Sequence, residues 1–210
     1  MSTGGSKNRE KKPRVAVVSL QGDFERHLAR LAEIGAEGYE ARLPAEIVSA
    51  DAVILPGGES TTIGKLLARY ELDKAIKNAH NQGKPIYGTC AGLILLARQI
   101  EQGTEERGGQ NLLGLLDITV ERNAFGRQVD SFESSIDAPT LVEKGGPPLS
   151  AVFIRAPIVT SMGSEVEALG RYNGKVVLVR QGKLLGSAFH PELTGDPRIH
   201  RYFLSLIGQE

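Results

Sequence analysis

The chain has 210 residues, 40% of them hydrophobic, and its 25 Lys and Arg residues balance its 25 Asp and Glu residues. This length and hydrophobic content suit one core and little more than one domain, and zero net charge excludes a general affinity for nucleic acid or anionic membranes. One cysteine excludes an intramolecular disulfide, and no apolar run approaches the roughly 18 residues of a membrane span. Because the N-terminal residues also lack a secretory signal pattern, we expect a soluble cytoplasmic protein.

The first 14 residues, MSTGGSKNREKKPR, differ in composition from the rest of the chain, because five basic residues and one acid give them a charge of +4. A short segment rich in Gly, Ser, Lys and Arg is typical of solvated disorder, although a basic tip is also able to contact an acidic partner. We therefore predict a disordered basic tail over residues 1–14 and a single domain over residues 15–210.

In the first half of the chain, short β-branched runs alternate with amphipathic stretches. VAVVSL (15–20) predicts a strand and FERHLARLAEIG (24–35) a helix with Asp23 as its N-cap. The pattern continues with the apolar run DAVILPGG, the helical segments TTIGKLLARY and LDKAIKNAHNQG, the strand KPIYG and the helix AGLILLARQI (91–100). Strands that are apolar on both faces, separated by such helices, indicate a parallel sheet covered on each side.

Beyond residue 100 the pattern changes to short strands with glycine turns, after the polar segment EQGTEERGGQN. We expect these strands to be antiparallel additions and the far edge of the same sheet: LLDITVERN, VDSFESSI, AVFIRAP, EVEALGRYN, KVVLVRQ and LLGSAF. PRIHRYFLSLIG predicts a closing helix, with Asp196 as N-cap and Pro197 at its first position. The predicted fold class is α/β, a three-layer sandwich with a mostly parallel central sheet and added antiparallel strands.

Cys90 lies where the strand PIYG meets the helix AGLILLA, in the pattern G-T-C-A-G from Gly88 to Gly92. This is the cysteine form of a nucleophile elbow, a tight turn that lifts the nucleophile above the carboxyl end of a sheet. The N-terminus of the following helix favours the thiolate over the thiol. The alternative is a small buried hydrophobe, the commonest role of a lone cysteine.

A thiolate nucleophile needs a base, and His190 is the best candidate among four histidines. His27 and His200 lie within predicted helices and His80 near a helix end, where histidines have ordinary structural roles. His190 occurs in GSAFHPE at the end of an apolar strand, with Glu192 two positions later. In an extended segment residues i and i+2 project to the same side, so the carboxylate can orient the imidazole.

Attack on a carbonyl also needs donors for the developing oxyanion. The loop LPGGEST (55–61) offers backbone N–H groups at Gly57 and Gly58, and the N–H of Ala91 follows the nucleophile directly. Such a Gly-Gly pair is often only a turn, but here it follows a parallel strand, where ligands bind in sheets of this kind.

Together, these segments resemble the glutaminase subunit of the two-component pyridoxal 5'-phosphate synthase, within the class I (triad) glutamine amidotransferases, which have a flavodoxin-like fold. YGTCAG and HPE are shared by the wider class, whereas PGGEST, VERNAFGRQ and FIRAP point to the vitamin B6 member. The resemblance runs from about Val15 to the C-terminus and is carried by LQGD, LPGGES, YGTCAG, ERNAFGRQVDSFE, FIRAP and AFHPE.

The resemblance implies that Cys90 attacks the glutamine carboxamide, that His190 is the general base and acid, and that Glu192 orients this histidine. It implies an oxyanion hole at Gly58 and Ala91, and places Gln21 near the site and the partner surface. The residues it assigns to glutamine binding are Gly58, Glu59, Ser60, Arg122, Ile154 and Arg155.

The resemblance further implies hydrolysis of L-glutamine to L-glutamate and ammonia, with the ammonia delivered to a barrel-shaped synthase subunit. That partner builds the cofactor ring from a pentose phosphate and a triose phosphate. No metal or prosthetic group is expected, because pyridoxal 5'-phosphate is the product of the complex. The isolated glutaminase is expected to be poorly active until docking reorganises its oxyanion loop.

Three alternatives remain open at this point. A glutaminase that serves another synthase would keep Cys90, His190 and Glu192 but lack the VERNAFGRQ and FIRAP segments. A related cysteine hydrolase or chaperone would have its histidine soon after the cysteine, whereas His190 follows Cys90 by 100 residues. A binding module without catalytic activity would leave the elbow and the His-Pro-Glu segment as coincidences.

Overall fold

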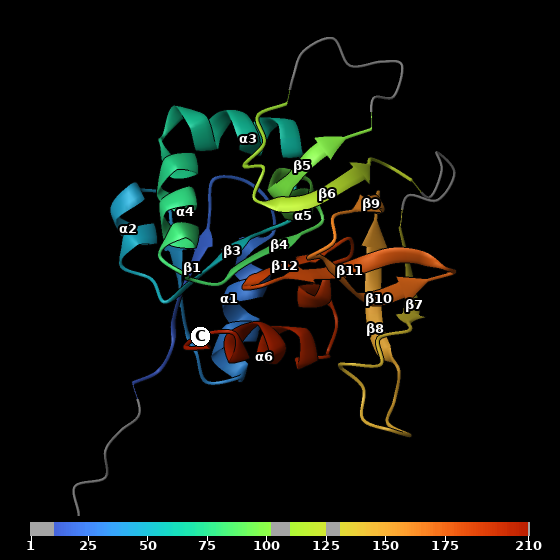
Figure 1. Ribbon diagram of the computed structural model, residues 1–210. Coiled ribbons are helices and arrows are strands. Elements are labelled where there is room, and N and C mark those ends of the chain that lie inside the picture. Colours follow the sequence, from blue (N-terminus) through green and yellow to red (C-terminus); the bar gives the residue numbers. More distant parts are fainter. Residues whose placement is uncertain (1–10, 102–109, 125–130, 210) are drawn as a thin grey trace, which may run out of the picture.

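The computed structural model describes residues 11–101, 110–124 and 131–209 (Figure 1). Most of the predicted basic tail, the polar segment after residue 101 and the second half of the VERNAFGRQ motif lie outside the described residues. Arg14, which we assigned to the tail, is instead the first residue of strand β1 (Arg14–Val18), because its backbone pairs with Glu37 of the neighbouring strand.

One half of the central sheet consists of five parallel strands in the order β2-β1-β3-β4-β12. The other four strands of this half are β2 (Glu37–Ala41), β3 (Ala52–Leu55), β4 (Ile86–Thr89) and β12 (Leu184–Ser187). All residues of β3, β4 and β12 are buried, since helices cover both faces of the sheet. The predicted parallel sheet is therefore confirmed.

The helices form layers on both faces of this sheet. In Figure 1, α1 (Phe24–Glu33) and α6 (Arg198–Ser205) lie below the strands, and α3 (Ser60–Arg69) and α4 (Leu72–Asn81) lie above them. The short α5 (Ala91–Leu96) packs against β3, β4 and β12, and α2 (Pro44–Val48) packs against α4. Within the three described stretches, every helix is too short or too polar to cross a lipid bilayer.

Two helix caps differ from the predictions. Asp23 precedes α1, but its side chain makes no capping hydrogen bond. At the last helix Pro197, not Asp196, is the N-cap residue, and the helix begins at Arg198. Asp196 still satisfies one free N–H of this helix, because its Oδ1 accepts from the Arg198 backbone at 3.0 Å.

The other half of the sheet is mainly antiparallel: β11 (Lys175–Gln181) pairs with β12, followed by β9 (Ile158–Met162), β6 (Leu116–Glu121) and finally β5 (Ala97–Ile100), with β10 (Glu167–Tyr172) on β11. The strand β9 was not predicted. The segment LLGSAF was predicted among the antiparallel strands at the far edge of the sheet. The structure corrects this, because β12 lies in the middle of the sheet and pairs in parallel with β4.

The predicted helix over residues 91–100 is too long. Helix α5 ends at Leu96, and Ala97 turns to an extended conformation (φ −61°, ψ 149°). The reason is tertiary, because the backbone of residues 97–100 pairs in parallel with β6. Leucine-rich sequence favours a helix here, and strand pairing outweighs that preference.

Strands β7 (Ser131–Ile136) and β8 (Leu149–Ile154) form a separate two-stranded antiparallel sheet, so our assignment of both to the main sheet was wrong. Aromatic side chains join this ribbon to the domain: Phe153 stacks on Phe132 at 4.8 Å between ring centroids and contacts Phe189 at 5.6 Å. Because β8 pairs with β7, it stays outside the large sheet. Its Val152 carbonyl instead accepts from the backbone of His190, just after the end of β12.

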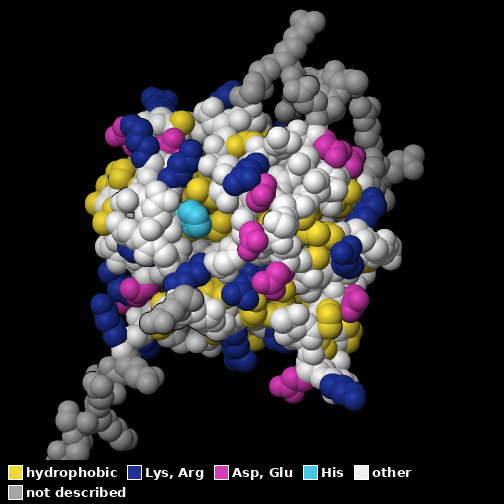
Figure 2. Space-filling view, viewed as in Figure 1, with side chains coloured by type: hydrophobic (Ala, Val, Ile, Leu, Met, Phe, Trp, Pro, Cys, Tyr) yellow, Lys and Arg dark blue, Asp and Glu magenta, His cyan; other side chains and the backbone are white. Residues whose placement is uncertain are grey.

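The described surface carries charges of both signs. On the face shown in Figure 2, Lys and Arg side chains lie among Asp and Glu side chains, in keeping with the zero net charge of the chain. The backbone of His190, which follows β12, is hydrogen-bonded to Val152 of β8. The loops at the carboxyl ends of the parallel strands therefore lie next to β8.

Close packing at the β3–β4–α5 junction gives a first prediction. A Cβ added at Gly92 would overlap the Leu55 carbonyl oxygen, a backbone atom, whereas one added at exposed Gly195 meets nothing within 4 Å. We expect Gly92→Ala to lower the free energy of unfolding by about 1–3 kcal/mol. We expect Gly195→Ala to match or slightly exceed wild type. Urea unfolding measures both, and an equally stable Gly92→Ala variant would contradict this packing.

Candidate active site

Loops that follow four parallel strands meet at one edge of the sheet. They carry Gln21 after β1, Gly57 after β3, Cys90 after β4 and His190 after β12. Because the carboxyl ends of parallel strands share one edge, ligand sites form there. These loops and β8 enclose a pocket of about 320 Å³, which is within the range of small-molecule sites.

The pocket brings together nearly all the residues expected from the sequence. Of the residues that we assigned to the site, those that line it are Gln21, Gly58, Glu59, Ser60, Cys90, Ala91, Arg122, Ile154, Arg155 and His190. Glu192 is the exception, because it lies behind His190 and is 2% exposed. Residues from distant parts of the sequence therefore meet in one place.

Cys90 has the backbone conformation of a nucleophile elbow. It lies between β4 and α5 with φ 49° and ψ −102°, a strained conformation for a residue with a side chain. Its N–H donates to the Ser187 carbonyl at 2.8 Å, which ties the turn to β12. The Sγ atom lies 3.8 Å from the Ile154 carbonyl oxygen and is directed into the pocket.

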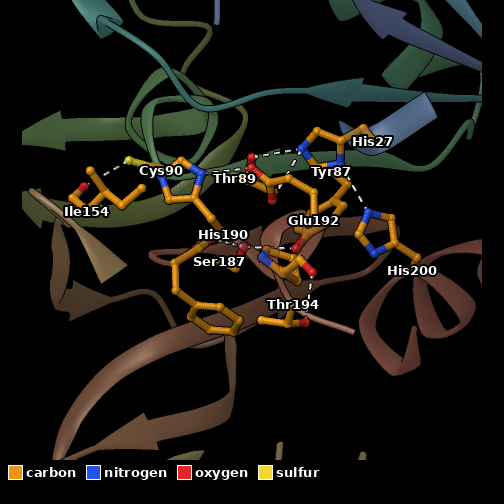
Figure 3. Close-up of polar contacts among 12 residues, drawn as sticks. His27, Tyr87, Thr89, Cys90, Ile154, Ser187, His190, Glu192, Thr194 and His200 are labelled. Carbon is orange, nitrogen blue, oxygen red and sulfur yellow. Dashed lines mark hydrogen bonds and ion pairs between the residues drawn. The ribbon is translucent and has the colours of Figure 1, made fainter. Parts of the chain in front are cut away.

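His190 and Glu192 are in direct contact. The His190 Nδ1 and Glu192 Oε1 atoms are 2.7 Å apart, and Figure 3 shows the other side of the imidazole facing Cys90. The sequence predicted this contact for the wrong reason, since residues Pro191–Leu193 form a 3₁₀ helix (η1) and not an extended segment. The His190 backbone N–H also donates to the Val152 carbonyl of β8 at 2.8 Å.

The charges around His190 stabilise its protonated form. Burial opposes protonation, but hydrogen bonds with Cys90 and Glu192 and the charges of both groups outweigh it and raise the pKa of His190 to about 10. Burial likewise tends to raise the pKa of Glu192, but His27 and the hydrogen bond from His190 outweigh it and lower that pKa. The carboxylate is therefore charged at neutral pH and holds the imidazole through Nδ1.

Glycines allow the loop after β3 to approach the other loops closely. A Cβ at Gly57 would overlap Cε1 of His190, and one at Gly22 would overlap the Gly57 carbonyl oxygen. Gly58 has φ +150°, a conformation that favours glycine. The Gln21 Oε1 atom accepts from the Glu59 backbone N–H at 2.8 Å, so Gln21 joins the first loop to this one.

Two charged side chains, Arg122 and Glu59, also line the pocket. Arg122 Nη2 is 3.7 Å from Glu59 Oε1, and Arg122 Nη1 donates to Gln110 Oε1 at 3.4 Å. The Glu59 carboxylate also caps α3 by accepting from the Thr61 and Thr62 backbones. Burial opposes ionisation of Glu59, but the hydrogen bonds from Thr62 and Thr61 together outweigh it and lower the pKa of Glu59 to about 2.

Sequence reasoning missed three residues near the site. His27 and His200 were assigned ordinary helical roles, yet His27 Nε2 lies 3.5 Å from Glu192 Oε2 and its Nδ1 3.0 Å from His200 Nε2. One signal was available for His27: its spacing of four residues from Leu31 places both on the buried face of α1. For Gln110, within a polar segment, the sequence offers no such signal.

Among the described residues, no group of three or more His, Cys, Asp and Glu side chains has an arrangement able to hold a metal ion.

Comparison with known proteins identifies similar chains over nearly the whole length. Residues 17–209 match the SNO glutamine amidotransferase family. The pyridoxal 5'-phosphate synthase subunit PdxT of Pelotomaculum thermopropionicum is 52% identical over 191 residues, which cover 91% of this chain and 93% of that protein. The protein of the same name from Herpetosiphon aurantiacus is 52% identical over 193 residues, covering 91% of this chain and 99% of that protein.

A solved structure is similar over the same extent. A crystal structure described as a glutamine amidotransferase superposes with a TM-score of 0.84 and 47% identity, covering 93% of this chain and 99% of that chain. A second structure, PurLQS from Thermotoga maritima, has a TM-score of 0.66 and 20% identity over 93% of this chain and 99% of that chain, and therefore supports the fold alone.

The contact between Gly57 and His190 gives a second prediction. We expect Gly57→Ala to displace the imidazole and to slow alkylation of Cys90 by iodoacetamide roughly tenfold, because the displaced ring no longer serves as a base beside the sulfur. The rate of mass gain at pH 7 measures this effect, with Gly195→Ala as the matched control. An unchanged rate in Gly57→Ala would show that His190 does not depend on this close approach.

Proposed function

Because the chain belongs to the SNO glutamine amidotransferase family, we propose that it is the glutaminase subunit of pyridoxal 5'-phosphate synthase. It hydrolyses L-glutamine to L-glutamate and ammonia, and the ammonia is used in vitamin B6 biosynthesis. The observation that carries this proposal is that the His190 side chain lies between Cys90 and Glu192 at the carboxyl edge of a parallel sheet, with 2.7 Å between His190 Nδ1 and Glu192 Oε1. These three side chains supply a nucleophile, a base and an orienting carboxylate.

In the first half of the proposed reaction, the Cys90 thiol gives its proton to His190, and the Cys90 sulfur attacks the carboxamide carbon of glutamine. The negative charge moves to the carbonyl oxygen, where backbone N–H groups at Ala91 and Gly58 stabilise it. His190, whose pKa is raised by its two neighbours, donates a proton to the leaving nitrogen, so ammonia departs and a glutamyl thioester remains.

In the second half, the now neutral His190 takes a proton from a water molecule. The resulting hydroxide attacks the thioester carbon, the carbon–sulfur bond breaks, and glutamate leaves with the Cys90 sulfur returned to its starting state. Glu192 keeps one ring orientation through both halves, because its Oε1 binds Nδ1 and leaves Nε2 for the proton transfers.

The charged region of the pocket suits the amino acid part of glutamine. The Arg122 guanidinium pairs with the substrate α-carboxylate, and Glu59 accepts from its α-ammonium group. A carboxylate has about four lone-pair positions, so Glu59 is able to cap α3 and bind substrate together. Ser60, Ile154 and Arg155 line the remaining wall, which directs the neutral carboxamide to Cys90.

The product argues for a protein partner, because ammonia released into neutral water becomes protonated and loses its nucleophilicity. Direct delivery to a synthase subunit avoids this loss, and we propose the barrel-shaped synthase as that subunit. Gln21, bonded to the Glu59 backbone, is placed to transmit docking to the oxyanion loop. The proposed reaction uses no metal or prosthetic group. The cytoplasmic location of the protein stays a prediction.

The proposal is tested first by glutamate release from glutamine, with the protein alone and with the synthase subunit added. We expect activity to rise when the synthase is added and to vanish in Cys90→Ala, since alanine lacks the sulfur that attacks the carboxamide. Equal hydrolysis by Cys90→Ala would remove this residue from the mechanism. An inactive wild type in the presence of the synthase would point to a different amidotransferase partner.

The role of Arg122 gives a separate prediction. In the complex, Arg122→Ala is expected to raise KM for glutamine roughly tenfold to hundredfold, the effect of losing one hydrogen-bonded ion pair to the substrate. Arg98→Ala is the matched control, because Arg98 forms an exposed ion pair with Asp117 and does not line the pocket. An unchanged KM in Arg122→Ala would exclude its contact with the α-carboxylate.

A further inference from the structure

Two buried histidines lie behind Glu192, on the opposite side from His190 (Figure 3). His27 comes from α1 and His200 from α6, and both are 0% exposed. His27 Nε2 is 3.5 Å from Glu192 Oε2 and 3.2 Å from Thr89 Oγ1, while its Nδ1 is 3.0 Å from His200 Nε2. The reaction outlined above uses neither ring.

Both rings are neutral at pH 7. Burial lowers the pKa of His27, although the Glu192 and Asp23 charges oppose this and the His190 charge adds to it. Burial is the main cause that lowers the pKa of His200 to about 3. The electrostatic effects of His27 and Arg30 add to it, and the charge of Glu192 opposes it. The neighbouring Tyr87 phenol is also neutral, because burial raises its pKa. Each histidine therefore carries a single ring proton.

The contacts determine which nitrogen carries that proton. If His27 were protonated at Nδ1, it would donate to His200 Nε2, and the proton of His200 would be at Nδ1, which has no hydrogen-bond partner among the described residues. A lone pair on His27 Nε2 would then face the Glu192 carboxylate. Both consequences are costly, because an unpaired buried donor and two opposed lone pairs are unfavourable.

The opposite arrangement removes both costs. His200 Nε2–H donates to His27 Nδ1, and His27 Nε2–H is directed at Glu192 Oε2 and Thr89 Oγ1. Glu192 Oε2 makes no regular hydrogen bond among the described residues, and the 3.5 Å contact with His27 Nε2 places the only such ring N–H within ion-pair distance of it. A buried carboxylate needs donors at both oxygens, and here one donor is His190 and the second is His27.

We infer that His27 is a positioning residue for the proposed glutaminase reaction: it holds the second oxygen of Glu192 through Nε2–H, in the tautomer that His200 selects. The inference rests on the proposed function. His27 keeps Glu192 ionised and fixed in orientation, and Glu192 in turn keeps the His190 ring aligned with Cys90. Through Thr89, the same ring contacts the residue before the nucleophile.

Two amide substitutions test this role in the complex with the synthase. Glutamine places its amide nitrogen near the position of histidine Nε2, whereas asparagine places it near Nδ1. We expect His27→Asn to lower kcat for glutamine hydrolysis roughly tenfold to hundredfold, the size of a hydrogen bond to a charged group, with little change in KM. We expect His27→Gln to recover most of this loss, since it restores a donor toward Glu192.

The pH profile is the readout that a purely structural role would not change. Losing the His27 donor raises the pKa of Glu192, so the acidic limb of kcat against pH moves to higher pH in His27→Asn and returns in His27→Gln. Equal kcat values and equal profiles for wild type and His27→Asn would overturn the inference. An inactive wild-type complex would instead overturn the proposed function.

A measurement on the wild-type protein keeps the inference testable if the variants do not fold. Nitrogen-15 NMR of the ring nitrogens distinguishes the two neutral tautomers of each histidine. We expect His27 and His200 both to carry their proton on Nε2 at pH 7. A proton on His27 Nδ1 would overturn the inference without any reference to activity.

Discussion

The turn at Cys90 is the constraint on which the site depends. A positive φ angle at a residue with a side chain is unfavourable alone and persists only where the surroundings hold it. Here the Cys90 N–H is tied to Ser187 of β12, and Gly92 allows α5 to approach the Leu55 backbone. The side chain is therefore presented at the carboxyl edge of the sheet, and the other groups of the site are arranged around it.

A second constraint is the burial of charge. Glu192 is a carboxylate that is 2% exposed, and such a group is stable only if neighbouring donors replace its hydration. His190 supplies one donor at 2.7 Å, and the His27–His200 pair lies at the other oxygen. The same arrangement that makes this charge tolerable keeps the imidazole in a single orientation, so stability and the proposed catalysis have a common physical cause.

The pocket separates two kinds of recognition. Near Cys90 the groups are backbone atoms and an imidazole at close quarters, which suits a reacting carboxamide. Farther away, Arg122 and Glu59 present opposite charges that suit the two charged groups of an amino acid. Gln21 accepts a hydrogen bond from the Glu59 backbone and therefore links the loop after β3 to the loop after β1.

The sequence by itself determined the parallel sheet, the strand-to-helix turn at Cys90 and the pairing of His190 with Glu192 as candidates, because apolar runs, glycines and short motifs are local information, whereas the resemblance to a family supplied the other pocket residues. Only the tertiary structure decided that residues 97–100 form a strand, that β7 and β8 form their own sheet, and that β12 lies beside β4. It also brought His27 and His200 to Glu192. These features depend on contacts between segments far apart in the chain, and local patterns cannot encode which distant partner a strand or a buried ring will meet.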